Sequence, residues 1–96
     1  MRKTITWNVE KARKLYEDTS RGGISFEDCV IAIEEGNVLD IIQNPSINHP
    51  NQKIYVLEIG GYAYSVPFTE TDEEIFLKTL FPSRKLTAIY LNKRKL

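Results

Sequence analysis

Two strand-like runs joined by a pair of glycines constrain the fold of this chain more than any other feature. Lys53–Ile59 and residues 62–69 are rich in β-branched and aromatic residues, and Gly60-Gly61 between them is typical of a two-residue hairpin turn. Side chains alternate between the two faces of a strand, so this turn sets Leu57 opposite Tyr64. The sequence therefore predicts an antiparallel pair with one face of large apolar side chains.

The runs on either side of the hairpin extend the sheet. Val38–Gln43 predicts a first strand, and residues 74–81 predict a fourth that follows a four-residue turn at 70–73. In this register Val66 lies opposite Leu77. The face expected to be buried holds Tyr55, Leu57, Ile59, Tyr62, Tyr64, Val66, Phe68, Ile75 and Leu77, and the opposite face holds Ile54, Val56, Glu58, Ala63, Ser65, Phe76 and Lys78.

Helix signals precede these strands. Asn8 is a suitable N-cap for a first helix, and Ser25 with Asp28 forms a capping box at the start of a second. Gly36 is suited to end the second helix. Apolar residues at helical spacing support both helices: Val9, Ala12, Leu15 and Tyr16 in the first, and Phe26, Cys29, Val30 and Ile33 in the second.

A last helix is predicted after Pro82 and Ser83, with Ile89 and Tyr90 on its packing side. Pro67 lacks an amide hydrogen, so its strand is expected to contain a bulge or an unpaired position. The predicted fold class is α+β, in two layers, with the order α-α-β-β-β-β-α. We expect an antiparallel meander sheet, all helices packed on one face, and a single domain that spans all 96 residues.

Charge is distributed unevenly along a chain whose net charge is zero. Residues 1–21 hold six basic and three acidic residues, residues 22–77 hold one basic and ten acidic residues, and residues 78–96 hold six basic and no acidic residues. If the fold brings both ends to one side, the protein presents a basic edge to a polyanion. Residues 93–96 alone have a second interpretation, as a solvated tail.

Several function classes are excluded by what the sequence lacks. Cys29 is the only cysteine, so neither an internal disulfide nor a cysteine-rich metal site is expected. No metal-ligand spacing, P-loop or dinucleotide fingerprint occurs, and we expect no cofactor. No apolar run is long enough for a signal peptide or a transmembrane helix, which predicts a cytoplasmic protein.

Three polar side chains are expected close together on the exposed face of the sheet. Lys78 lies opposite Ser65 in the predicted register, and Glu58 lies one strand further, within diagonal reach. These residues supply an ammonium, a hydroxyl and a carboxylate. The exposed face is therefore the expected location of an open site.

Arg84 and Lys85 begin the last predicted helix, where the helix dipole disfavours positive side chains. A bound anion would account for them, because helix-start amides and a bidentate arginine bind phosphate well. The alternative is an ion pair between Arg84 and Glu58 or Glu74. The sequence supports the two interpretations equally.

Three segments resemble the BrnT-type toxins of bacterial toxin–antitoxin pairs, which are related in fold to the RelE ribonucleases. They are WNVEKARK at residues 7–14, GISFEDCVIAI at 23–33 and FLKTLFPSRKLTAIYL at 76–91. Within the third segment, residues 83–85 match a Ser-x-Arg-Lys-type motif of the family. The resemblance implies a two-layer α+β fold, RNA cleavage, and an antitoxin that blocks the toxin.

The implied chemistry is metal-independent RNA cleavage, in which the 2′-hydroxyl attacks the adjacent phosphate. The enzyme must accept one proton, stabilise the charged phosphorane and help the 5′-oxygen leave. Glu58 is the candidate base. Arg84, its neighbour Lys85 and Lys78 are the candidate charge-stabilising residues, and Lys78 is also the candidate acid.

Other basic residues are candidates for RNA binding: Lys11, Lys14, Lys53 and His49. His49 stands beside Pro50, and such a loop histidine is also typical of an exposed turn. We expect the antitoxin to cover the same basic surface as RNA, and a homodimer within the toxin–antitoxin complex is one arrangement considered. The alternative function is a noncatalytic module whose basic edge binds RNA or a protein.

Overall fold

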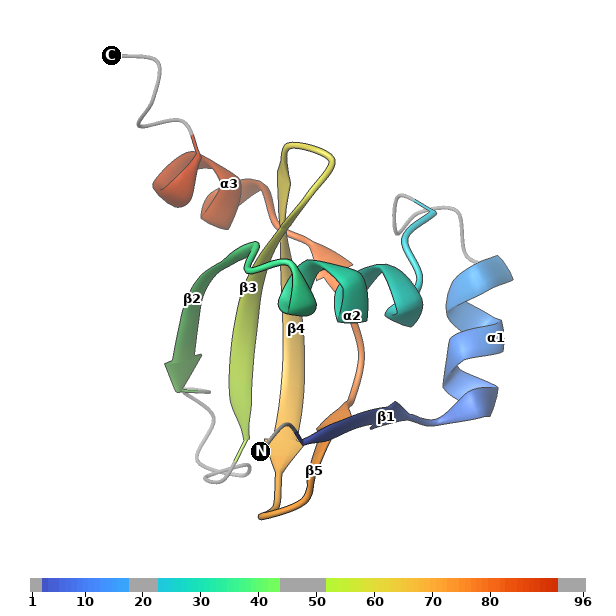
Figure 1. Ribbon diagram of the computed structural model, residues 1–96. Helices are drawn as coiled ribbons and strands as arrows, with labels where there is room; N and C mark the ends of the chain where they lie inside the picture. The colour runs from blue at the N-terminus through green and yellow to red at the C-terminus, as the bar shows by residue number, and fades with distance from the viewer. Residues whose placement is uncertain (1–2, 18–22, 44–51, 92–96) are drawn as a thin grey trace.

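The computed structural model describes residues 3–17, 23–43 and 52–91, which form an α+β fold (Figure 1). The strands make one sheet in the order β1-β5-β4-β3-β2, with β6 beside β4. The predicted fold class is confirmed. In chain order the elements are β1 (Thr4–Trp7), α1 (Val9–Glu17), α2 (Phe26–Glu34), β2 (Val38–Gln43), β3 (Lys53–Ile59), β4 (Tyr62–Glu70), β5 (Glu74–Leu77), β6 (Phe81–Pro82) and α3 (Arg84–Tyr90).

The main core lies between one face of the sheet and helices α1 and α2. Phe26 and Cys29 of α2 are fully buried in one cluster with apolar side chains of β3, β4 and β5. In Figure 1, α2 lies across this face. Tyr64, Val66 and Leu77 were predicted to be buried, and each is at most 6% exposed. Strand alternation therefore identified the core face correctly.

The predicted caps hold the first two helices at their ends. Asn8 Oδ1 accepts a hydrogen bond from the Lys11 amide at 3.0 Å, which fixes the start of α1. At α2, the Ser25 amide donates to Asp28 Oδ2 at 2.9 Å, and Ser25 Oγ accepts from the Asp28 amide at 3.3 Å. Gly36 follows α2 with φ of 82°, a left-handed conformation that favours glycine.

The hairpin between β3 and β4 has the predicted register. Gly60 and Gly61 both have positive φ, 62° and 81°, as a tight hairpin turn with matching twist requires. Ile59 pairs with Tyr62, and the pairing continues along the two strands as far as Lys53 and Phe68. This hairpin forms the centre of the sheet.

The N-terminal strand β1 was missed by the sequence interpretation. It pairs in parallel with β5, with Ile5 beside Ile75, so the sheet is not wholly antiparallel as expected. Trp7 packs on the core and stacks on Phe26 with ring centroids 5.7 Å apart. A four-residue strand next to an N-cap shows little alternation, and its partner is far away in the sequence.

Helix α3 packs on the face opposite α2, so the prediction that all helices share one face is wrong. Thr87 Oγ1 accepts from the Ala63 amide at 2.9 Å, and Tyr90 donates to Asp40 Oδ2 at 2.5 Å. Asp40 pairs with Val56, which places it on the face opposite the main core. Val56 and Ala63 are fully buried there, because α3 supplies a second, smaller apolar layer. Ile89, predicted to pack, is 41% exposed.

The turn between β4 and β5 is tighter than predicted. Phe68 pairs with Leu77 rather than Ile75, which shifts the register by two residues and preserves the faces. Thr71 closes the turn, since its amide donates to the Glu74 carbonyl at 2.8 Å and its hydroxyl accepts from the Glu74 amide at 3.1 Å. The predicted strand at 74–81 is also divided into β5 and β6, and the break lies beside Pro67.

Cys29 provides a test of the main core. Burial, with a smaller contribution from the Asp28 charge, raises the pKa of its thiol to about 12. Because the thiolate is the reactive form, we expect the native protein not to react with dithionitrobenzoate at neutral pH. The denatured protein should release one equivalent of thionitrobenzoate. Rapid stoichiometric reaction of the native protein would contradict the packing of α2 against the sheet.

Candidate nucleic-acid interface

A shallow basic groove lies between α1 and the end of β5. It has a volume of about 350 Å³ and is lined by Asn8, Glu10, Lys11, Lys14, Phe76 and Lys78. We call it the lysine groove. Lys78 Nζ lies 5.4 Å from the centroid of the Phe76 ring, close enough for a cation–π contact. The groove therefore combines three ammonium groups with an aromatic side chain.

The groove results from two local patterns and one long-range pairing. Lys11 and Lys14 are three residues apart on α1 and lie on the same side of that helix. Ala12 and Leu15 face the core instead. The parallel pairing of β1 with β5 carries α1 to the edge of the sheet (Figure 1). Lys78 directly follows β5 and lines the groove together with residues of α1.

The three lysines of the groove are not neutralised by the residues that surround them. Within the described ranges, none of the ion pairs involves Lys11, Lys14 or Lys78. Glu10, the one carboxylate of the groove lining, is already held by Arg13, whose Nη2 contacts both of its oxygens at 2.9 and 2.7 Å. The lysine groove is therefore an electropositive surface suited to an anion.

The predicted grouping of Glu58 with Lys78 and Ser65 is wrong. The Lys78 amide donates to the Pro67 carbonyl at 2.8 Å, whereas Glu58 pairs with Ala63. Four residues along β4 separate these positions, or about 13 Å at 3.3 Å per residue. Ser65 pairs with Phe81 instead and is 6% exposed. The cause is the two-residue change of register at the β4–β5 turn.

Arg84 and Lys85 lie at the other end of the same strand edge. Ser83 caps α3 by accepting from the Leu86 amide at 3.1 Å, and its own amide donates to the Ala63 carbonyl at 3.0 Å. Both basic side chains are exposed. In the part of the chain that the structure describes, Arg84 forms no ion pair with Glu58 or Glu74, the alternative raised by the sequence.

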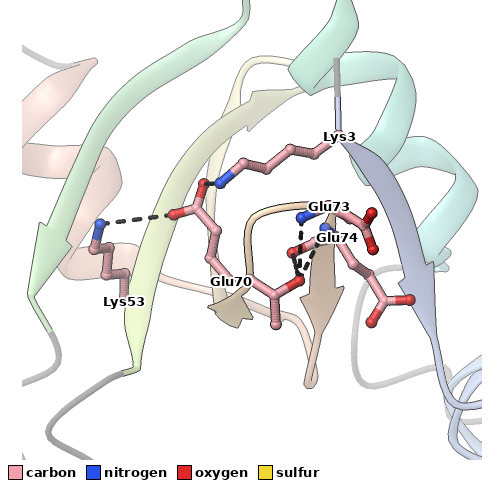
Figure 2. A network of polar contacts seen from close by, with 6 residues as sticks. Lys3, Lys53, Glu70, Glu73 and Glu74 are labelled. Carbon is pink, nitrogen blue, oxygen red and sulfur yellow. Dashed lines mark hydrogen bonds and ion pairs between the residues drawn. The ribbon is translucent and has the colours of Figure 1, made fainter. Parts of the chain in front are cut away.

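Lys53 belongs to a separate cluster around Glu70, at the end of β4 far from Ala63. Figure 2 shows Lys3 and Lys53 directed towards the Glu70 carboxylate from two sides, at 2.6 and 3.7 Å. The hydrogen bond from Lys3, followed by the charges of both lysines, lowers the pKa of Glu70 from its usual 4.5. Lys53 is thus partly neutralised, while His49 lies outside the described residues.

Sequence reasoning found the lysines of the groove but missed Glu10 and the role of Phe76. The spacing of Lys11 and Lys14 was the available signal, since it places both on one side of a helix. Phe76 was assigned to the exposed face correctly. Its position beside α1 depends on the β1–β5 pairing, which was not predicted.

Comparisons with protein-family models, curated proteins and solved structures found no match. No helix in the described ranges combines the length and apolar character needed to span a membrane. Over those same ranges, no three His, Cys, Asp or Glu residues are grouped so as to hold a metal ion. The functional argument therefore depends on the geometry and charge of the surface.

The Lys3–Glu70–Lys53 cluster predicts a pH-dependent stability. The contribution of the cluster to folding stability is complete above the usual carboxyl pKa of 4.5. It is lost as pH falls through the lower pKa that Glu70 has in the folded protein, because protonated Glu70 no longer pairs with lysine. Urea unfolding should show Glu70→Gln to be less stable than wild type by about 0.5 kcal/mol at neutral pH, as for other exposed ion pairs.

The difference in free energy of unfolding between wild type and Glu70→Gln should decrease in acid. A suitable control is Glu73→Gln, because Glu73 is a nearby carboxylate with no ion pair among the described residues. If Glu70→Gln and wild type differ in free energy of unfolding by the same amount above and below pH 4.5, the difference does not come from charge pairing.

Proposed function

We propose that this protein is an RNA-cleaving toxin that binds the RNA backbone in the lysine groove. The observation that supports this best is the convergence of Lys11, Lys14 and Lys78 from two separate elements, with none of them in an ion pair among the described residues. Such a surface attracts phosphates by charge, and lysine contacts supply most of the affinity in nonspecific nucleic-acid binding. The α+β fold agrees with the fold implied by the resemblance to BrnT-type toxins.

General-base catalysis of this cleavage needs a proton acceptor beside the bound phosphate, and Glu10 is the carboxylate among the residues that line the groove. In the proposed reaction, Glu10 accepts the proton of the 2′-hydroxyl while that oxygen bonds to phosphorus. The bond to the 5′-oxygen breaks, and Lys78 donates a proton to this leaving group. Lys11 and Lys14 stabilise the charged phosphorane. The products are a 2′,3′-cyclic phosphate and a 5′-hydroxyl, and water restores both protonation states.

Arg84 and Lys85 extend the basic surface beyond the groove. They are assigned to neighbouring phosphates. Glu58 lies on the adjacent strand beside Ala63, whose carbonyl accepts from the Ser83 amide at the start of α3. Glu58 is therefore the second candidate for the base, paired with Arg84 rather than with Lys78. An antitoxin that carries carboxylates would cover the same cations and exclude RNA.

A noncatalytic RNA-binding module is the second candidate function, and one observation favours it. Both oxygens of Glu10 accept hydrogen bonds from Arg13, so this carboxylate is already engaged within α1 and would have to leave Arg13 to contact a 2′-hydroxyl. Such a protein would bind RNA in the lysine groove without cutting it. A cleavage assay separates the two functions.

Loss of the groove lysines should weaken RNA binding. We expect Lys14→Ala/Lys78→Ala to lower the affinity for an RNA oligonucleotide and to reduce the slope of log affinity against log salt by about 1.4, since each single-strand phosphate contact contributes about 0.7. Lys53→Ala is the matched control, because it also removes a lysine but one that is paired with Glu70. Fluorescence anisotropy over a salt series measures both quantities, and equal slopes for all three proteins would reject the groove as the binding site.

Cleavage should depend on Glu10 more than on Glu58. With a 5′-labelled RNA, Glu10→Gln is expected to lower the cleavage rate by about 10²-fold or more, the usual effect of losing a general base, while RNA affinity is retained. Glu58→Gln should cut at close to the wild-type rate. The opposite result would move the base to Glu58 and Arg84, and binding without cleavage by the wild type would identify the noncatalytic module.

A further inference from the structure

Phe81 on β6 exposes a large aromatic ring next to the lysine groove. Its side chain is 41% exposed. Phe81 pairs with Ser65, and Phe76 pairs with Thr69. Ser65 and Thr69 are an even number of residues apart on β4, so Phe81 and Phe76 lie on the same face of the sheet. This is the face that carries the groove.

The hydrogen bonds of β4 give the order of the side chains along this edge. The Lys78 amide bonds to the Pro67 carbonyl, Phe81 pairs with Ser65, and the Ser83 amide bonds to the Ala63 carbonyl. These three positions succeed one another at steps of two residues, or about 7 Å each. Phe81 therefore lies midway between Lys78 and the residues that follow Ser83.

The arrangement of cation, aromatic ring and cation fits a single-stranded nucleic acid. Lys11, Lys14 and Lys78 lie on one side of Phe81, and Arg84 and Lys85 are exposed on the other. Single-strand binding surfaces combine cations that follow the backbone with aromatic rings that stack on bases. The bases of a duplex are already stacked on each other, so an exposed ring of this kind selects an unpaired base.

We propose that Phe81 stacks on an unpaired base of single-stranded RNA whose backbone runs from the lysine groove to Arg84. The inference rests on the proposed function and adds the substrate class and the stacking residue. An acidic peptide with an apolar anchor is the competing ligand. The two ligands differ in what they need at position 81, because stacking requires a π face whereas an apolar anchor requires only a hydrophobic contact.

The test compares Phe81→Leu, Phe81→Trp and Ile41→Ala for binding to a labelled RNA oligonucleotide, single-stranded and annealed to its complement. Phe81→Leu keeps an apolar side chain and should bind the single strand about ten-fold more weakly, the loss expected for one stacked base. Phe81→Trp should bind as tightly as wild type, with quenching of the added tryptophan. Ile41 is 50% exposed on β2, remote from the groove, and Ile41→Ala should change nothing.

Each other outcome contradicts the proposal in an identifiable way. Single-strand affinity that is unchanged in Phe81→Leu, or reduced equally for the duplex, removes the stacking role of Phe81 and leaves the lysine groove untouched. Loss of affinity in Phe81→Leu without loss in Lys14→Ala/Lys78→Ala instead rejects the groove. An absence of RNA binding by the wild type, with tight binding of a poly-glutamate peptide, rejects both in favour of a protein ligand. Circular dichroism melting confirms that each variant is folded.

Discussion

The pairing of β3 with β4 through Gly60-Gly61 is the interaction on which the rest of the structure depends. It sets Leu57 and Val66, both fully buried, on the face that α2 covers. Each such side chain contributes about 1.5–3 kcal/mol on burial. A slip of one residue would turn this whole apolar set towards the other face. The later strands β5 and β6 both pair with β4. Carbonyls of β4 also accept hydrogen bonds from the amides of Lys78 and Ser83.

The features predicted correctly from the sequence are those with local causes. The capping box of Ser25 and the hairpin at Gly60-Gly61 depend on residues within a few positions of each other. The β4–β5 turn was predicted two residues too long, because the hydrogen bonds of Thr71 decide its length and composition alone does not. The lysine groove needed the pairing of Ile5 with Ile75, seventy positions apart, which no local pattern specifies.

The placement of the carboxylates explains why a chain of zero net charge still has an electropositive surface. Glu70 is paired with lysines at one end of β4, and Asp40 accepts from Tyr90 at the edge of the sheet. That hydrogen bond also raises the pKa of Tyr90. Glu10, the carboxylate of the groove lining, is held by Arg13, and the three groove lysines form no ion pair among the described residues. Their attraction reaches about 10 Å at 0.1 M salt, so association with a polyanion should be fastest at low ionic strength.

The position of α3 accounts for both the second apolar layer and the surface left open beside it. The helix has 7 residues and is about 10 Å long, whereas β4 has 9 residues and extends about 30 Å. Its contacts, Thr87 with Ala63 and Tyr90 with Asp40, lead from β4 towards β2 and away from β5. Phe76 and Phe81 are therefore not covered by α3. A helix that packed over β5 would bury this edge, so the same choice of face that completes the fold also keeps the candidate RNA surface accessible.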